Sequence, residues 1–591
     1  MQQAGIIEKV NGPVVVASCD SHLSLYDMVY VGTHKLLGEV VSLQNHRETC
    51  LCTIQVYEST GGLMPGMPIY SDFEPLSLLL GPGLAGSVLD GIARPLKVLA
   101  HEDGAFLSRG KNFPSLDAEK EWEVYICVKE GDVLSPGQVY AVCAETAALE
   151  HKLLVPPGMQ GTVVSAASSG QYRIHDTVVT LQNGNQTHTL TLCQKWPIRT
   201  PRPSAMRLAP DCPLVTGQRV IDTFFPVAKG GAACLPGPFG AGKTITQHQL
   251  AKWSAADIIV YIGCGERGNE ITQVMEEFSG LIDPRRGLPL FDRTILIANT
   301  SNMPVASREA SIYTGMTIAE YYRDMGYDVA VMADSTSRWA EALREISGRL
   351  EEMPAEEGFP AYLPSRLAEF YERCGRVKTL SGSEGSVTAI GAVSPQGSDF
   401  SEPVTQNTKR FTRTFWALDR SLAYARHFPA IHWLNSYSEY IEELAPWYDQ
   451  HCGPEFLKQR ARAQALLQEE SKLMEIVKLI GADMLPDDQK LIIETARVLR
   501  DGFLQQNAYH PIDTYVPLAK QQAMLAAILH LYDKAQTLVA RSIPISELRQ
   551  TGIWDRLIRM KYNISNDDLA AFDSLNTAID QAVEQVLAQN S

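Results

Sequence analysis

Long apolar runs are missing from this chain of 591 residues. Apolar stretches such as Leu76–Leu80 and Met524–Leu529 fall far short of the ~18–20 residues that a membrane-spanning helix needs. The first residues also lack a basic stretch followed by an apolar core and a small-residue cleavage site, so they predict no secretory signal. We therefore expect any association with a membrane to pass through partner proteins.

Cysteines are few and show no pattern. The 11 cysteines include no Cys-x-x-Cys pair, and an odd number scattered along a long chain is not a disulfide framework. We expect them to be reduced, as in the cytosol. Cys50 and Cys52 lack further ligands at metal spacing, and His427, His432 and His451 form no His-x3-His pair. A zinc-type metal site is therefore not expected.

Positive charge is scarce. The 52 Lys and Arg residues face 68 Asp and Glu residues, which gives a net charge of −16. Such a surface repels the phosphates of nucleic acids and anionic lipids, although a local basic groove is compatible with it. We expect no nucleic acid partner. Hydrophobic residues at 45% and charged residues at 20% exclude a disordered or fibrous protein.

The first third of the chain is rich in short β-type runs. At ~100–200 residues per domain, the length predicts three to five domains. Residues 1–72 carry β-type runs between Gly, Pro and polar turns, which is typical of a small β-barrel. Residues 116–199 have the same character and predict a separate β-rich insertion. It ends at Trp196–Pro203, where three prolines predict an extended crossing segment.

The pattern then changes from β-rich to α/β and finally to helical. Residues 73–115 and 200–440 are predicted to form one α/β domain, because near-continuous apolar strands alternating with helices indicate a parallel sheet covered on both faces. Its predicted strands are Ala232–Leu235, Ile258–Gly263, Thr294–Ala298 and Val329–Ala333. Residues 441–591 predict a helical bundle. Its predicted helices are Pro454–Ile480, Asp487–Leu499, Pro517–Ser542, Ile543–Leu557 and Asp567–Leu587.

A phosphate-binding motif lies in the α/β domain. Gly-Pro-Phe-Gly-Ala-Gly-Lys-Thr fits G-x-x-x-x-G-K-[ST] and stands between a predicted strand and the helical stretch Thr244–Ala255. Such glycines let backbone amides and a helix N-terminus converge on phosphate oxygens. Lys243 would supply a cation for the β- and γ-phosphates, and Thr244 a ligand for Mg²⁺. The nucleotide-binding candidates are Gly237, Pro238, Phe239, Gly240, Ala241, Gly242, Lys243 and Thr244. The alternative, a glycine-rich turn without a ligand, fits this context poorly.

Asp334 is a candidate for the second Mg²⁺ ligand. It ends the apolar run Asp328–Asp334, and a carboxylate at the C-terminal end of a parallel strand lies beside such a phosphate loop. The alternative is an aspartate that caps the following helix, and the two roles can coexist.

Glu266 is a candidate to orient water for attack on a γ-phosphate. It follows the predicted strand Ile258–Gly263 and stands between glycines that allow close approach of a ligand. The alternative is a surface glutamate that opens a helix at Asn269–Phe278. Local sequence alone does not decide between these two roles.

Several longer motifs are found along the chain: Pro213–Asp222, Gly263–Glu270, Asp334–Ser347, Pro354–Leu363, Pro429–Ser438 and Phe503–Tyr509. They resemble those of the catalytic A subunits of V-type (A/V-type) rotary ATPases. The resemblance spans essentially the whole chain, including the insertion at about residues 116–199, which these A subunits carry and F-type β subunits lack.

The resemblance implies an N-terminal β-barrel, a RecA-like nucleotide-binding domain and a C-terminal helical domain. It implies that three copies alternate with three non-catalytic B subunits in a hexamer, with central and peripheral stalk subunits. ATP would be hydrolysed or made with Mg²⁺ at the A/B interfaces, and this would be coupled to H⁺ or Na⁺ movement through a separate membrane sector. The chain would then lie at the cytoplasmic face of a membrane, and its length favours a bacterial plasma membrane.

The resemblance also implies roles for individual residues. Glu266 would activate water and Arg267 would support the γ-phosphate region, while Lys243, Thr244 and Asp334 keep the roles given above. Two aromatic residues, Phe428 and Tyr509, would enclose the adenine base. Many eukaryotic A subunits have a cysteine in place of Ala241, so redox control by a thiol in this loop is not expected, and this residue also favours a bacterial source.

Two other functions fit parts of the sequence. A ring subunit that binds nucleotide without turnover would need neither Lys243 nor Glu266, so the presence of both disfavours it. A RecA-like hexameric RNA translocase would need a basic face bearing aromatic residues. The net charge of −16 and the insertion disfavour that function.

Overall fold

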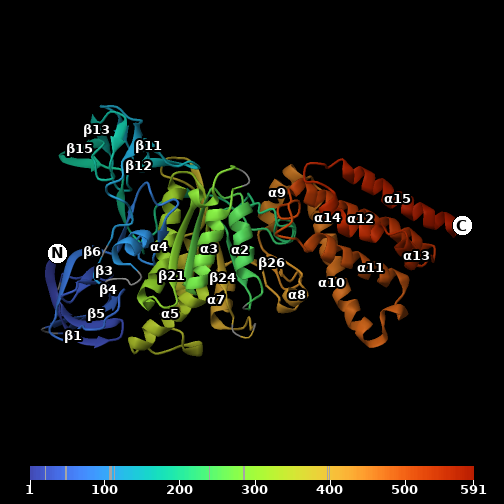
Figure 1. Cartoon of the computed structure of the whole chain (residues 1–591), viewed down its shortest axis with the longest axis horizontal. Helices are drawn as coiled ribbons and strands as arrows, with labels where there is room; N and C mark the ends of the chain where they lie inside the picture. The colour runs from blue at the N-terminus through green and yellow to red at the C-terminus, as the bar shows by residue number, and fades with distance from the viewer. Residues whose placement is uncertain are drawn as a thin grey trace.

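The computed structural model describes residues 1–590 apart from 20–21, 47–48, 105–108, 112, 239, 284–285, 396 and 398. Figure 1 shows an N-terminal barrel at one end of the long axis, a central sheet with helices, and a helical region at the other end. The β-rich insertion projects beside the barrel. Among the helices of the described residues, none is both long and apolar enough to span a bilayer.

The N-terminal region is a closed six-stranded barrel with strand order β1-β2-β5-β4-β3-β6. Alternate residues point inward, and the inner side chains of Val15, Val29 and Ile54 are fully buried. The predicted barrel is therefore confirmed. Its strands are β1 (Gln2–Asn11), β2 (Val14–Cys19), β3 (Asp27–Val31), β4 (Leu36–His46), β5 (Thr49–Val56) and β6 (Pro68–Pro75).

The insertion consists of two four-stranded antiparallel sheets, with orders β10-β13-β15-β16 and β12-β11-β9-β14. Its strands are β9 (Trp122–Ile126), β10 (Val133–Leu134), β11 (Val139–Thr146), β12 (Leu149–Leu154), β13 (Gly161–Ala166), β14 (Gly170–Tyr172), β15 (Val179–Asn183) and β16 (Gln186–Leu190). The chain then returns through β17 (Gln194–Pro197), which pairs with β7 (Ser77–Leu80). This pairing forms the start of the predicted crossing segment.

The central domain contains a sheet with order β26-β25-β19-β24-β22-β20-β21-β8. Helices α2 (Lys243–Trp253), α3 (Gly268–Gly280), α4 (Val305–Asp324) and α5 (Thr336–Arg349) connect and cover its strands. The strands are β8 (Val88–Leu89), β19 (Ala232–Pro236), β20 (Ile258–Glu266), β21 (Thr294–Thr300), β22 (Asp328–Asp334), β24 (Glu384–Val393), β25 (Thr414–Phe415) and β26 (Tyr437–Ser438). The four strands predicted here are confirmed.

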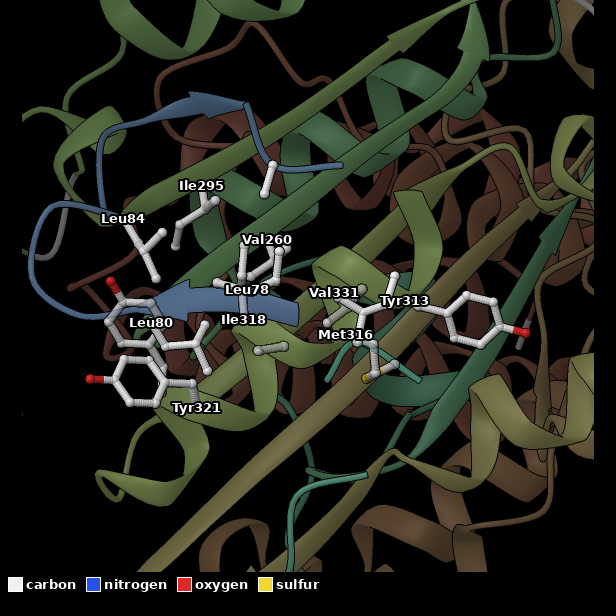
Figure 2. Close-up of a cluster of buried hydrophobic side chains, with 14 of the residues drawn as sticks. Leu78, Leu80, Leu84, Val260, Ile295, Tyr313, Met316, Ile318, Tyr321 and Val331 are labelled. Atoms are coloured by element: carbon white, nitrogen blue, oxygen red, sulfur yellow. The ribbon is translucent and has the colours of Figure 1, made fainter. Parts of the chain in front are cut away.

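Strand β24 and helix α4 are the main elements among those of this domain that were not predicted from the sequence. Strand β24 lies between β19 and β22, but Ser386 and Thr388 interrupt its apolar pattern with buried hydroxyl groups. Helix α4 is buried almost all round, so it has no amphipathic period. Figure 2 shows its residues Ile318 and Tyr321 in one buried cluster with Leu80 of β7.

The C-terminal region is helical throughout most of its length. Its helices are α9 (Ile441–Cys452), α10 (Phe456–Ile480), α11 (Asp487–Val498), α12 (Leu518–Ala540), α13 (Ile545–Gln550), α14 (Ile553–Asn563) and α15 (Ala571–Gln589). The prediction of one helix over Ile543–Leu557 is wrong. The segment forms two helices because Gly552 adopts a φ of 72°, in the left-handed region that glycine tolerates.

A buried ion pair joins the helical region to the central domain. The guanidinium of Arg219 donates to Asp513 at 2.5 Å, and both side chains are fully buried. It also donates to the carbonyl oxygens of Phe503 and Gln505, at 2.5 and 2.7 Å. Next to this pair, the backbone N–H of Gln506 donates to the carbonyl of Phe428 at 2.8 Å. The C-terminal segment that carries Tyr509 is thereby fixed near Phe428.

Candidate active site

A cleft of about 840 Å³ opens where the central parallel strands end. It is bordered by the phosphate loop, the ends of β20 and β22, and the first turns of α3 and α5. Parallel α/β sheets bind ligands at this edge. The predicted residues that line the cleft are Pro238, Gly240, Gly242, Lys243, Thr244, Glu266, Arg267 and Asp334. Phe239 lies outside the described residues.

The phosphate loop connects β19 to α2. Gly240 and Gly242 have φ angles of 80° and 89°, a conformation that other residues adopt only at a cost. The Nζ atom of Lys243 donates to the carbonyl of Gly237 at 2.7 Å, so the lysine folds back across its own loop. Burial lowers the pKa of Lys243, and the carboxylates of Asp334 and Glu266 oppose that shift. The loop thus presents a cation in a curved backbone.

Asp334 and Thr244 lie together at the floor of the cleft. The Thr244 hydroxyl is 3.5 Å from Oδ2 of Asp334, and the Tyr261 hydroxyl donates to the same oxygen at 3.1 Å. Burial raises the pKa of Asp334, while Lys243 and the Tyr261 hydrogen bond lower it. Helix α5 has its N-cap at Ser335. The helix-capping alternative for Asp334 is therefore wrong, and its carboxylate with a hydroxyl is a donor set that suits Mg²⁺.

Glu266 ends β20 and is half-buried. Burial raises its pKa to about 8, and Asp334 and a hydrogen bond with Glu270 raise it too, while Arg338 lowers it. Helix α3 begins at Gly268, and Glu270 is the acidic residue in its first turn. The structure thus gives the helix-opening role to Glu270 and leaves Glu266 at the edge of the cleft.

The raised pKa of Glu266 predicts a pH-dependent stability. The usual value of 4.5 holds in the unfolded chain, so the folded state binds this proton more tightly. The resulting stabilisation is complete below about pH 4.5 and is lost as the pH rises to about 8. One pKa unit corresponds to ~1.4 kcal/mol, so the full shift sets only an upper bound on this effect. Because Glu266 is half-buried and water screens part of its interactions, we expect Glu266→Gln to gain about 1–2 kcal/mol relative to the parent between pH 5 and pH 8.5.

Thermal unfolding of both proteins at pH 5 and pH 8.5, without nucleotide or Mg²⁺, measures this difference. Glu276 lies on the exposed face of α3, so Glu276→Gln is the matched control and is expected to show no such pH dependence. An equal effect of Glu266→Gln at the two pH values would contradict the prediction.

Three arginines that were not predicted also line the cleft: Arg308, Arg338 and Arg420. Arg338 donates to both carboxylate oxygens of Glu341, at 3.0 and 2.8 Å. Its place in the first turn of α5, four residues after Asp334, is a signal that could have identified it. Arg308 belongs to the unpredicted helix α4, and Arg420 comes from a distant segment. The cleft lining thus combines basic side chains with the carboxylates of Glu266, Glu270, Asp334 and Glu341. In a chain of net charge −16, such a concentration of basic residues suits an anion, and the carboxylates suit its metal ion.

The two predicted aromatic residues lie outside the cleft itself. Phe428 is 39% exposed and lies against the phosphate loop, since a Cβ atom at Gly242 would be 3.4 Å from its ring. Tyr509 is 83% exposed, and its backbone N–H donates to the side chain of Asn507. The structure brings Phe428 to the loop and holds the segment of Tyr509 near Phe428, while the Tyr509 side chain is largely exposed to solvent.

Four family profiles match the chain. The nucleotide-binding domain of the ATP synthase alpha/beta family matches residues 217–438, and the β-barrel domain of the same family matches residues 7–71. The barrel-sandwich domain of ATP synthase alpha/beta subunits matches residues 113–199. The C-terminal domain of V and A type ATP synthase matches residues 445–549.

Full-length relatives and a solved structure agree with these matches. The V-type ATP synthase alpha chain 2 of Clostridium tetani is 58% identical over 99% of this chain and 98% of its own length. The A subunit of the A-type ATP synthase of Methanopyrus kandleri is 53% identical over 99% of both chains. The assembled ATPase EscN of the enteropathogenic E. coli type III secretion system shares the fold, with a TM-score of 0.64 at 20% identity over 89% of this chain and 100% of its own. The chain therefore belongs to the family of V-type and A-type ATP synthase alpha (A) chains.

Proposed function

We propose that this chain is the catalytic subunit of a rotary ATPase that hydrolyses or makes ATP and is coupled to H⁺ or Na⁺ transport. The observation that carries the proposal is the convergence of Lys243, Thr244, Asp334 and Glu266 on one cleft at the sheet edge. A phosphate loop, a metal-binding carboxylate and a water-orienting carboxylate are the parts that phosphoryl transfer needs. Family membership supports the same activity.

In this proposal each side chain has a distinct task. Lys243 binds the β- and γ-phosphates in place of its present contact with the Gly237 carbonyl. Thr244 and Asp334 would hold Mg²⁺, which neutralises charge on the phosphates when bound. Glu266, once ionised, accepts a hydrogen bond from the attacking water and orients it. Arg267 lines the cleft, where its charge would face the γ-phosphate region.

The same proposal covers the adenine base. Phe428 lies beside the loop, where its ring could stack on a base and contribute ~0.5–1.5 kcal/mol beyond area burial. Tyr509 would cover the other face after a rotation of its exposed side chain, since its segment is already held near Phe428. Because the Tyr509 side chain is mostly exposed to solvent, it has room for this rotation.

We further propose that three copies alternate with three B subunits, with stalk subunits and a membrane sector beyond them. The complex would lie at the cytoplasmic face of a membrane, and relatives from Clostridium support a bacterial one. An arginine supplied by the neighbouring subunit raises kcat by ~10³–10⁵ in related phosphoryl-transfer systems. The proposal also divides the chain into a barrel (1–72), a nucleotide-binding domain (73–115 and 200–440), a β-rich insertion (116–199) and a helical domain (441–591).

Hydrolysis of ATP by the purified chain, first by itself and then with its cognate B-type partner, tests the proposal. We expect weak Mg²⁺-dependent activity of the chain by itself and roughly a hundredfold or greater activation on reconstitution, because the partner completes the site. The B-type partner by itself is the control. High activity of this chain without the partner would instead indicate a self-sufficient ring and favour the homohexameric translocase.

A further inference from the structure

One buried side chain touches the metal-binding carboxylate from behind. The hydroxyl of Tyr261 donates to Oδ2 of Asp334 at 3.1 Å, and Thr244 approaches the same oxygen at 3.5 Å. Tyr261 is buried on β20 and does not line the cleft, so it cannot touch a substrate there. Its hydroxyl acts on the site only through Asp334.

The sheet register explains how Tyr261 reaches this carboxylate. Strands β20 and β22 are parallel neighbours, and Tyr261 pairs with Met332 while Gly263 pairs with Asp334. The backbone of Tyr261 therefore lies two residues below the level of Asp334. Its long side chain carries the hydroxyl up to the level of the carboxylate, whereas a shorter polar residue at the same position would fall short.

The ring of Tyr261 is fixed by packing against two helices. It lies 6.2 Å from the ring of His248 on α2 and 5.8 Å, edge to face, from Phe278 on α3. His248 is itself held by Glu277, with Nδ1 2.6 Å from the carboxylate oxygen. The donor thus has a fixed position behind the phosphate loop, and burial keeps its pKa well above the usual value, so it stays protonated.

We propose that Tyr261 is a positioning residue, whose hydroxyl holds the Asp334 carboxylate in the orientation that binds Mg²⁺ together with Thr244. The inference rests on the proposed function of the cleft. Hydrogen bonds to a ligating carboxylate orient it, and losing such a partner typically costs 10–100-fold in metal affinity. The hydroxyl carries this effect, since a phenylalanine ring keeps the packing against His248 and Phe278.

Binding of a fluorescent ADP analogue to the full chain tests the role of Tyr261 without using activity. The analogue is titrated in EDTA and then at increasing Mg²⁺ concentrations. For Tyr261→Phe we expect an affinity in EDTA within about twofold of the parent. We expect the Mg²⁺ concentration that gives half of the metal-dependent gain to rise about tenfold.

Tyr313→Phe is the matched control. Tyr313 is a buried tyrosine on α4 in the same domain, and its hydroxyl has no hydrogen-bond partner among the described residues. Its variant is expected to follow the parent in both titrations. An unchanged Mg²⁺ dependence of Tyr261→Phe overturns the inference, as does an equal loss of affinity with and without Mg²⁺, which would indicate a purely structural role. If the parent chain binds no ADP analogue at all, the proposed function itself fails.

Discussion

Replacing Glu266 by glutamine is expected to lower the turnover of the assembled complex roughly a hundredfold or more, because positioned acid–base groups contribute ~10²–10⁴-fold. Glutamine keeps the size and hydrogen-bonding reach of the side chain but cannot accept a proton or carry charge. The affinity for nucleotide should remain near that of the parent, since Lys243 and Thr244 hold the phosphates. Steady-state ATP hydrolysis and equilibrium nucleotide binding, measured on the same preparation, separate the two effects.

Glu270 provides an informative comparison for this prediction. It hydrogen-bonds Glu266 and raises the pKa of that residue, but Glu266 lies nearer the strand end. Glu270→Gln should therefore change the pH dependence of turnover more than its maximum. Glu276→Gln, on the exposed face of the same helix, should leave turnover unchanged. If Glu266→Gln turns over ATP at the parent rate, Glu266 has no part in the mechanism.

The sequence predicted those parts of the site that are encoded by neighbouring residues. The phosphate loop is one such part, because eight consecutive residues carry the glycines, the lysine and the hydroxyl. Asp334 and Glu266 could also be found, because each follows an apolar run whose end marks the edge of a parallel sheet. Local sequence leaves two roles open for Glu266, and the family resemblance favours the water-activating one. The structure adds that Glu270, not Glu266, is the acidic residue in the first turn of α3.

The parts that were not predicted depend on strand pairing or on burial that hides the usual periodic pattern. Strand β24 lies at the centre of the sheet, yet its glycines and hydroxyl residues hide the apolar pattern. Helix α4 carries Arg308 into the cleft. Because α4 is buried on nearly all sides, its sequence lacks the alternation of polar and apolar faces by which a helix is recognised. The contact of Tyr261 with Asp334 follows from the register of β20 against β22, and no local motif encodes a register.

Replacing Lys243 by alanine is expected to weaken nucleotide binding and abolish turnover together. A hydrogen bond to a charged group contributes ~1.5–3 kcal/mol, so the affinity should fall roughly tenfold to a hundredfold. The substitution also affects the loop itself, because the Lys243 ammonium donates to the Gly237 carbonyl at 2.7 Å and thereby keeps the loop curved. Equilibrium nucleotide binding to the full chain and ATP hydrolysis by the assembled complex measure the two losses.

Two further variants show whether charge or geometry is responsible. Lys243→Arg keeps the positive charge but replaces the compact ammonium by a larger, planar guanidinium. Compared with Lys243→Ala, it should recover part of the nucleotide affinity and little of the turnover. Lys252→Ala, at the far end of the same helix α2 and away from the cleft, should behave as the parent. Full activity of Lys243→Ala would show that this loop does not bind the phosphates. The proposed roles of Thr244 and Asp334 would then also be wrong, because both residues are placed by the phosphates that this loop is proposed to hold.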